Sequence, residues 1–144
     1  MPRTKAKQEN AQPKLPEDLI KNHVHSEDET QCPVVTALNL IGSKWKIVII
    51  YNLMDGMKRF NELQKLLPGI TQKMLAMRLR ELEKDGIIDR KIYAVVPPKV
   101  EYTLTSFGQS LEKMIEQVKS WGLDINNLSK QKKSKNKKSA KKPA

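Results

Sequence analysis

Side chains suited to recognition chemistry gather on one side of a helix predicted between Thr71 and Asp85. A helical wheel turns one outward set away from the leucines of this segment, namely Lys73, Ala76, Met77, Arg80 and Lys84, with Thr71 and Gln72 in the leading turn. Their ammonium, guanidinium, hydroxyl and amide groups can hydrogen-bond to phosphate oxygens and base edges, and no member of the set is acidic. The pattern therefore predicts recognition of a nucleic acid.

The rest of the chain offers little for catalysis or metal binding. Residues 32–122 contain no histidine, and we find no phosphate-binding glycine loop and no nucleophile motif, so we expect no enzyme. His23 and His25 have no third histidine or cysteine near them, so we expect no metal site and no cofactor. Cys32 is the single cysteine, which excludes an intramolecular disulfide.

The outward set requires neighbouring elements that hold the opposite side of its helix. One narrow stripe of the wheel must pack inward: Leu75, Leu79, Leu82 and Gly86. A shorter helix precedes it, with a capping-box pattern formed by Asn61 and Gln64, and ends at Pro68 and Gly69. Two helices joined by so tight a turn are typical of a helix-turn-helix.

Further helices lie on both sides of this pair. An apolar helix begins at Pro33 and stops at Gly42, and Ser43 caps a second helix that reaches Met54. Thr105 caps a last helix whose apolar residues recur at helical spacing.

Between the recognition helix and the last helix, the apolar period changes to two. This alternation predicts a β-hairpin over residues 88–104, with its tip at 94–99. Its cations are Arg90, Lys91 and Lys99. Helices, a helix-turn-helix and a basic hairpin in this order predict a mainly α (α+β) fold, a winged helix-turn-helix with a two-stranded β-wing.

Charge divides the chain into three parts. Residues 1–31 have a net charge of −1 and a composition too polar to fold, which predicts a flexible N-terminal arm, whereas the domain at 32–122 carries +5. Residues 123–144 contain eight lysines and carry +7, and we expect a flexible Lys-rich tail that contacts phosphates. The total of +11 favours double-stranded DNA as partner. Without an apolar leader or a membrane-length apolar run, we expect a cytoplasmic, nucleoid-associated protein with no membrane partner.

Several strings of the domain carry a family resemblance: CPV at 32–34, IGSKWK at 41–46, RFNEL at 59–63, LPGITQKML at 67–75, LRELEKDG at 79–86, VPPKVEY at 96–102 and LTSFG at 104–108. The segment 32–122 resembles the HxlR family of winged-helix transcription regulators, relatives of the MarR group. The resemblance implies a homodimeric, sequence-specific DNA-binding regulator that acts as repressor or activator.

Dimerisation also follows from apolar surface. The first and last helices carry more of it than a thin winged helix can cover, so we expect N- and C-terminal dimerisation helices. The predicted interface residues are Val34, Leu38, Leu111, Met114, Ile115, Val118 and Trp121. A two-fold dimer would read an inverted repeat, with its recognition helices about 34 Å apart.

Cys32 has two interpretations. It lies at a helix start, where unpaired N–H groups and the helix dipole favour a reactive thiolate. The HxlR resemblance implies a redox or electrophile sensor at this position, whereas the alternative is a small residue that only packs.

A second function remains open for the whole chain. A non-sequence-specific architectural protein would use the basic wing and the Lys-rich tail to coat or bend nucleic acid. A wing that contacts another protein is a third possibility, and the sequence leaves any small-molecule effector unknown.

Overall fold

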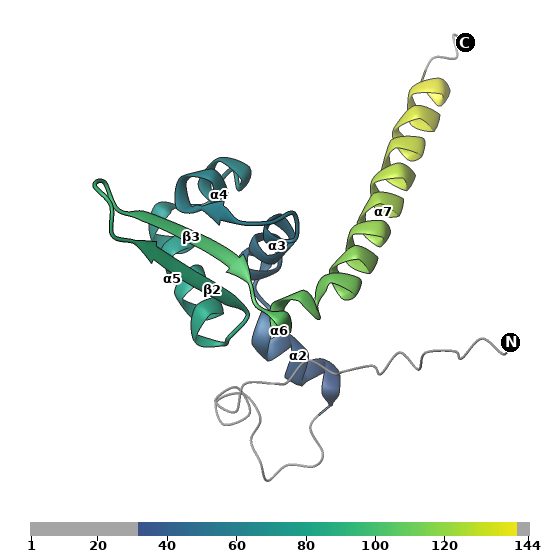
Figure 1. The fold of residues 1–144 in the computed structure, drawn as a ribbon. Helices are drawn as coiled ribbons and strands as arrows, with labels where there is room; N and C mark the ends of the chain where they lie inside the picture. The colour runs from purple at the N-terminus through teal and green to yellow at the C-terminus, as the bar shows by residue number, and fades with distance from the viewer. Residues whose placement is uncertain (1–31, 141–144) are drawn as a thin grey trace, which may run out of the picture. The chain divides into compact units, whose positions relative to one another are not determined.

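The fold is given by a computed structural model in which residues 32–140 are described. The arm predicted at residues 1–31, with His23 and His25, lies outside the described residues, as do residues 141–144. The chain divides into two compact units, Met1–Ser110 and Leu111–Ala144. In the first unit the predicted winged helix-turn-helix of mainly α class is confirmed (Figure 1).

Two apolar helices open the described chain, α2 (Pro33–Ile41) and α3 (Lys44–Leu53). Pro33 suits the first turn of α2, where its missing N–H would have no helical partner. Helix α3 lies in the core, with Ile49, Ile50 and Leu53 no more than 2% exposed. Within residues 32–140 no single helix is long and apolar enough to cross a membrane; α2 and α3, bent by 77°, reach that length and composition only as a pair.

The helix-turn-helix consists of α4 (Phe60–Leu66) and α5 (Gln72–Lys84). The capping box predicted at Asn61 is wrong, because α4 begins earlier: Arg59 is the N-cap, and its N–H donates to the Glu62 carboxylate at 2.8 Å. Pairing in a short strand holds Arg59 extended, and this fixes the helix start. Gly69 turns the chain at φ +93°, a conformation that favours glycine, so the second helix can begin at once.

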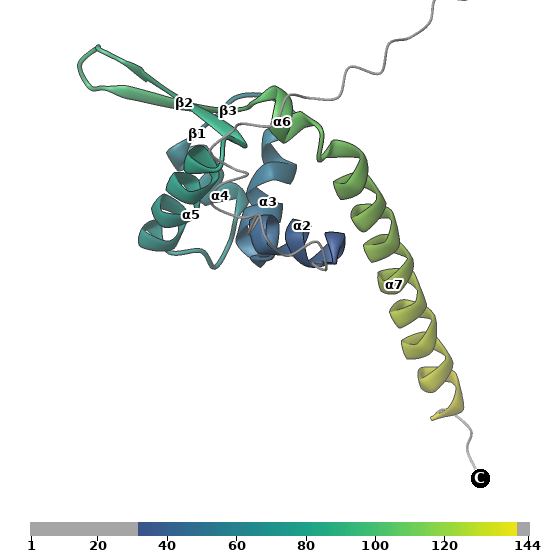
Figure 2. The same ribbon diagram turned by 90° about the horizontal axis from the view of Figure 1, so that it is seen from below.

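The sheet has three strands in the order β1-β3-β2, so the predicted two-stranded wing is incomplete. The predicted hairpin is confirmed as β2 (Ile88–Tyr93) and β3 (Lys99–Leu104), and β1 (Lys58–Arg59) adds to its other side. A strand of two residues shows no alternation, so the sequence pattern missed it. Figure 2 shows the hairpin tip projecting beyond the helices of this unit.

The predicted last helix is interrupted. Its cap is confirmed, since Thr105 Oγ1 accepts from the Gly108 N–H at 3.0 Å, but this helix, α6 (Ser106–Gln109), has only four residues. Gly108 permits a close approach, because a Cβ there would lie 2.2 Å from the Ile87 carbonyl oxygen. The hydroxyl of Thr105 also donates to the Gly86 carbonyl at 2.6 Å, which fastens α6 to the start of the hairpin.

The second unit is built on α7 (Glu112–Ser139), a helix of 28 residues. The segment from residue 123, expected to be a flexible Lys-rich tail, is helical as far as Ser139. One interior glycine costs a helix only about 1 kcal/mol relative to alanine, and lysine is a good helix former. Leu123 and Leu128 also continue the apolar residues beyond Gly122.

Candidate nucleic-acid interface

Buried leucines fix the orientation of α5. Leu75, Leu79 and Leu82 are no more than 2% exposed, and each contributes about 1.5–3 kcal/mol by burial, so the predicted inward stripe is confirmed. Thr71 caps the helix as predicted, because its Oγ1 accepts from the Met74 N–H at 3.1 Å. The helix stops at Gly86, whose φ of +71° no interior helical residue adopts.

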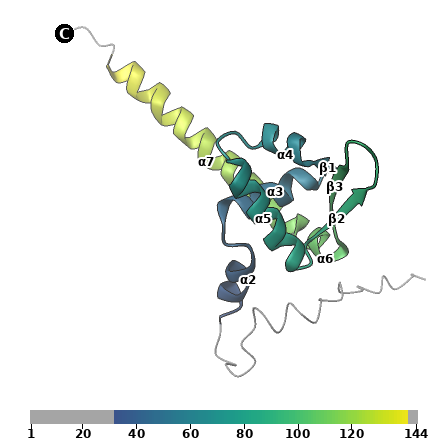
Figure 3. The same ribbon diagram turned by 90° about the vertical axis from the view of Figure 1, so that its left-hand side faces the viewer.

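The opposite side of α5, whose course Figure 3 shows, carries the predicted outward set, and most of these side chains are exposed to solvent. Six of its members are exposed: Thr71, Gln72, Lys73, Met77, Arg80 and Lys84. Met77 is 39% exposed, and Ala76 is half-buried. The described structure thus leaves this cationic side uncovered within the first unit.

The sequence analysis missed Glu83, which is also exposed on α5. It lies three residues after Arg80, a spacing that places two helical side chains on neighbouring positions of one face. The position of Glu83 on the helical wheel, close to Arg80, indicated this, but the outward set contained only cationic, polar and apolar residues. The face that α5 presents is therefore of mixed charge near its C-terminal end.

The cations predicted on the wing do not share a face. The register pairs Arg90 with Tyr102 and Lys91 with Glu101, and consecutive residues of a strand point to opposite sides. Arg90 is on the face of the buried Tyr102, while Lys91 and Lys99 are on the other face. There the Lys91 ammonium lies 4.8 Å from the centre of the Tyr93 ring.

The wing tip is more apolar than the analysis of its cations suggested. Val95 is 47% exposed and Val96 is fully exposed, next to Pro97 and Pro98. Apolar tips of this kind can enter a DNA minor groove, where cationic residues flank them.

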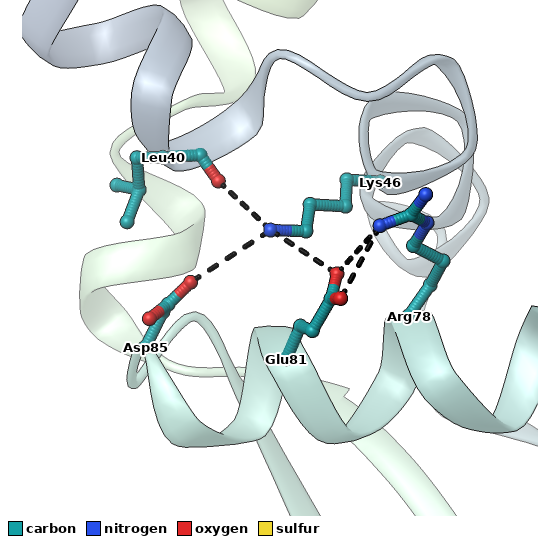
Figure 4. A network of polar contacts seen from close by, with 5 residues as sticks. All are labelled: Leu40, Lys46, Arg78, Glu81 and Asp85. Carbon is teal, nitrogen blue, oxygen red and sulfur yellow. Dashed lines mark hydrogen bonds and ion pairs between the residues drawn. The ribbon is translucent and has the colours of Figure 1, made fainter.

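An ion-pair network beneath the outward set ties α5 to α2 and α3 (Figure 4). Lys46, which is 9% exposed, donates to the Leu40 carbonyl at 3.4 Å and pairs with Glu81 at 3.3 Å. Asp85 lies 4.0 Å from the same ammonium group. Arg78 donates to both oxygens of the Glu81 carboxylate, at 2.9 Å to Oε2, the oxygen that also pairs with Lys46, and at 3.2 Å to Oε1. One carboxylate therefore joins two cations.

The network also sets the ionisation of Glu81. Burial alone raises the pKa of this carboxyl, but hydrogen bonds from Arg78 and Lys46, with the charges of both, outweigh it and hold the pKa below its ordinary value. Sequence reasoning missed the network. The features that could have indicated it are Lys46, within an otherwise apolar helix, and the two carboxylates Glu81 and Asp85, which are four residues apart.

The predicted sensor and dimer residues are exposed, with two exceptions, Leu111 and Ile115. Cys32 is the exposed N-cap residue of α2, and its neighbours Val34 and Leu38 are 63% and 53% exposed. On α7 the exposed fractions are 37% for Met114, 48% for Val118 and 68% for Trp121. Leu111 is half-buried, and Ile115 is 3% exposed, so Ile115 offers no surface to a second copy.

A family model described as HxlR-like helix-turn-helix matches residues 40–130, which include α5 and the whole hairpin. This chain belongs to that family. It is a helix-turn-helix transcriptional regulator, and DNA binding follows from the family. The resemblance stated from the sequence is confirmed.

Individual transcriptional regulators are also similar to this chain. The uncharacterized HTH-type transcriptional regulator YdeP of Bacillus subtilis (strain 168) is 58% identical over 97 residues, 67% of this chain and 76% of YdeP. The redox regulator HypR in its oxidized form is 54% identical, with a TM-score of 0.63, over 65% of this chain and 96% of HypR. The reduced form of YodB from B. subtilis is 43% identical, with a TM-score of 0.56, over 63% and 90%.

Proposed function

We propose that this HxlR-type regulator binds an inverted-repeat operator as a homodimer, at the nucleoid in the cytoplasm. The observation that carries the proposal is the exposed cationic side of α5 above a stripe of buried leucines. A helix of this diameter fits the major groove of B-form DNA. Two symmetric copies would then contact half-sites about 34 Å apart, which is one helical turn.

The polar residues of the outward set would have two roles, hydrogen bonding at the start of the helix and electrostatic attraction of the DNA backbone. Thr71 and Gln72 begin the helix and can hydrogen-bond to base edges or phosphates, while Lys73, Arg80 and Lys84 attract the backbone. The wing would follow the flanking DNA, with Arg90, Lys91 and Lys99 as its cations. Ala76 and Met77 would supply apolar contact to base methyl groups.

The occupant that we propose for the exposed apolar faces is a second copy of the chain. Val34 and Leu38 on α2 form one such face, and Met114, Val118 and Trp121 on α7 form another. Exposed apolar patches rimmed by polar residues mark interfaces, and an isologous contact closes after two copies. Ile115, which is buried, is left out of this interface.

We propose that Cys32 senses oxidants or electrophiles. Its support is the exposed position at the start of α2, two residues before the exposed Val34, and the description of the related HypR as a redox regulator. Oxidation would form a disulfide, either between the Cys32 thiolates of two copies or between one Cys32 thiolate and a small thiol, and the two electrons would pass to the oxidant. If a Cys32→Ser variant keeps the full response of DNA binding to diamide, the sensor role is refuted.

The basic end of α7 would add affinity for DNA of any sequence. The lysines between 130 and 138 lie on a helix, so they are spaced at a rise of about 1.5 Å per residue rather than spread along a loose coil. Their contribution would depend on salt, because each phosphate contact releases counterions.

The test is footprinting of the full chain on the DNA upstream of its own gene, with sedimentation at the same concentration. We expect a two-fold symmetric footprint on an inverted repeat and a dimer in solution. Specific regulators bind their operator about a thousandfold or more above random DNA. Equal affinity for all duplexes would instead support the architectural alternative. Binding to no duplex would support the third possibility, in which the wing contacts another protein.

A further inference from the structure

A hollow of about 100 Å³ lies between α5 and the sheet, and we name it the helix–wing hollow. Its lining residues are Ala76, Leu79, Arg80 and Glu83 from α5, Arg90 from β2 and Tyr102 from β3. The volume is several times the ~30 Å³ that one water occupies in the liquid. The hollow therefore has room for a small polyatomic group.

Tyr102 is the buried polar residue of this hollow. It is 7% exposed, and within residues 32–140 its hydroxyl makes no hydrogen bond. Burial raises the pKa of Tyr102 above its ordinary value, although the nearby Arg90 charge opposes the effect. The phenol is therefore protonated at neutral pH and has one hydrogen to donate.

Two guanidinium groups reach the same place from different elements. Arg90 lies directly opposite Tyr102 in the β2–β3 register, and opposed residues point to the same face of a sheet. Arg80 comes from the outward set of α5. Neither arginine forms an ion pair with a carboxylate of the described residues, so both are available to a ligand.

Glu83 limits the charge of the hollow. Two guanidinium groups against one carboxylate leave a charge of +1, which suits one singly charged anion. A DNA phosphodiester carries one negative charge and two free acceptor oxygens, and arginine and hydroxyl groups are its usual donors.

We infer that the helix–wing hollow binds one phosphodiester of the DNA backbone, with Arg80 and Arg90 on its two sides and the Tyr102 hydroxyl donating to an oxygen. The inference rests on the proposed function and adds Tyr102 and Glu83, which that function does not use. Because phosphates are the same in every sequence, the contact positions the junction of α5 and the wing without reading bases.

The experiment measures the affinity of the full chain for a random-sequence duplex over a series of salt concentrations. Tyr102→Phe should weaken binding about tenfold at every salt concentration, since a hydrogen bond to a charged group is lost but no charge is. Arg90→Gln should reduce the slope of log K against log salt by about 1. Glu83→Gln should tighten binding several-fold, because it removes the repulsion.

Tyr93→Phe is the matched control, since Tyr93 lies on the opposite face of the hairpin. If Tyr102→Phe binds as tightly as Tyr93→Phe, or Glu83→Gln weakens binding, the inference is overturned while DNA binding stands. If the wild type binds no duplex in low salt, the proposed function fails first. Should Tyr102→Phe unfold, the exposed Arg90 and Glu83 variants still decide the question.

A free anion is the other source of phosphate chemistry. Inorganic phosphate, exchanged for chloride at constant ionic strength, should leave the binding of the random-sequence duplex unchanged in the wild type. Inhibition that disappears in Tyr102→Phe would show that the hollow takes free phosphate, and it would overturn the assignment to DNA.

Discussion

Replacing Lys46 by methionine tests the network that holds the recognition helix. Methionine keeps the apolar stem of the side chain but removes the charge that faces Leu40, Glu81 and Asp85. Loss of one partner from a fully buried ion pair costs about 3–5 kcal/mol. The Glu81 side chain keeps Arg78 at 2.9 Å and is 35% exposed, so we expect a smaller loss of unfolding free energy, about 2 kcal/mol.

The pH dependence of this loss has a defined sign. The pKa of Glu81 is lowered by folding, so the carboxylate contributes stability above its unfolded pKa, and this contribution is lost as the pH falls through the folded value. The difference between wild type and Lys46→Met should therefore be full at neutral pH and shrink on acidification below the ordinary carboxyl range.

Urea unfolding at several pH values measures both effects. Lys65→Met is the control, because Lys65 is exposed on α4 and forms no ion pair within the described chain. Its effect on the free energy of unfolding should stay below about 0.5 kcal/mol. A Lys46→Met protein as stable as wild type would refute the reasoning, since desolvation would then outweigh the pairing. So would a difference that grows as the pH falls.

Four further perturbations test other parts of the protein. Gly108→Ala should lower the free energy of unfolding by about 3 kcal/mol or more, because its Cβ would lie 2.2 Å from the Ile87 carbonyl oxygen. A Cβ at Gly122 meets nothing within 4 Å, so Gly122→Ala should stabilise α7 by about 1 kcal/mol. Thermal melting of both variants measures these effects. Trp121→Ala should shift a dimer towards monomer in sedimentation, and an unchanged dimer would exclude this face. Deleting residues 129–144 should flatten the salt dependence of DNA binding while operator discrimination persists; lost discrimination would contradict a purely electrostatic role.

The elements that position the interface were predictable where short-range signals agree. Threonine caps at Thr71 and Thr105 and the leucine stripe of α5 depend only on residues a few positions apart, and the structure confirms all of them. The hairpin followed from its alternation and its two prolines. Patterns within short stretches of sequence thus predicted most of the helices and strands of the first unit.

What the sequence did not predict depends on contacts between distant residues. The strand β1 exists because Lys58 and Arg59 pair with Tyr102 and Glu101, and no pattern within two residues shows that. The Lys46 network and the helix–wing hollow likewise join elements that are separate in the sequence. The helix over residues 123–139 was missed for a different reason: its lysine-rich composition indicated a flexible tail, although lysine is a good helix former.

The central claim is that DNA meets the outward set of α5, and the affinity ratio of operator to random duplex tests it most directly. Gln72→Ala and Arg80→Ala should each lower operator affinity about tenfold, and Gln72→Ala should also lower the ratio, because a base contact is worth about 1–3 kcal/mol. Lys65→Ala, away from this face, should change neither quantity. Unchanged operator binding in both α5 variants, with a loss in Lys65→Ala, would contradict the account.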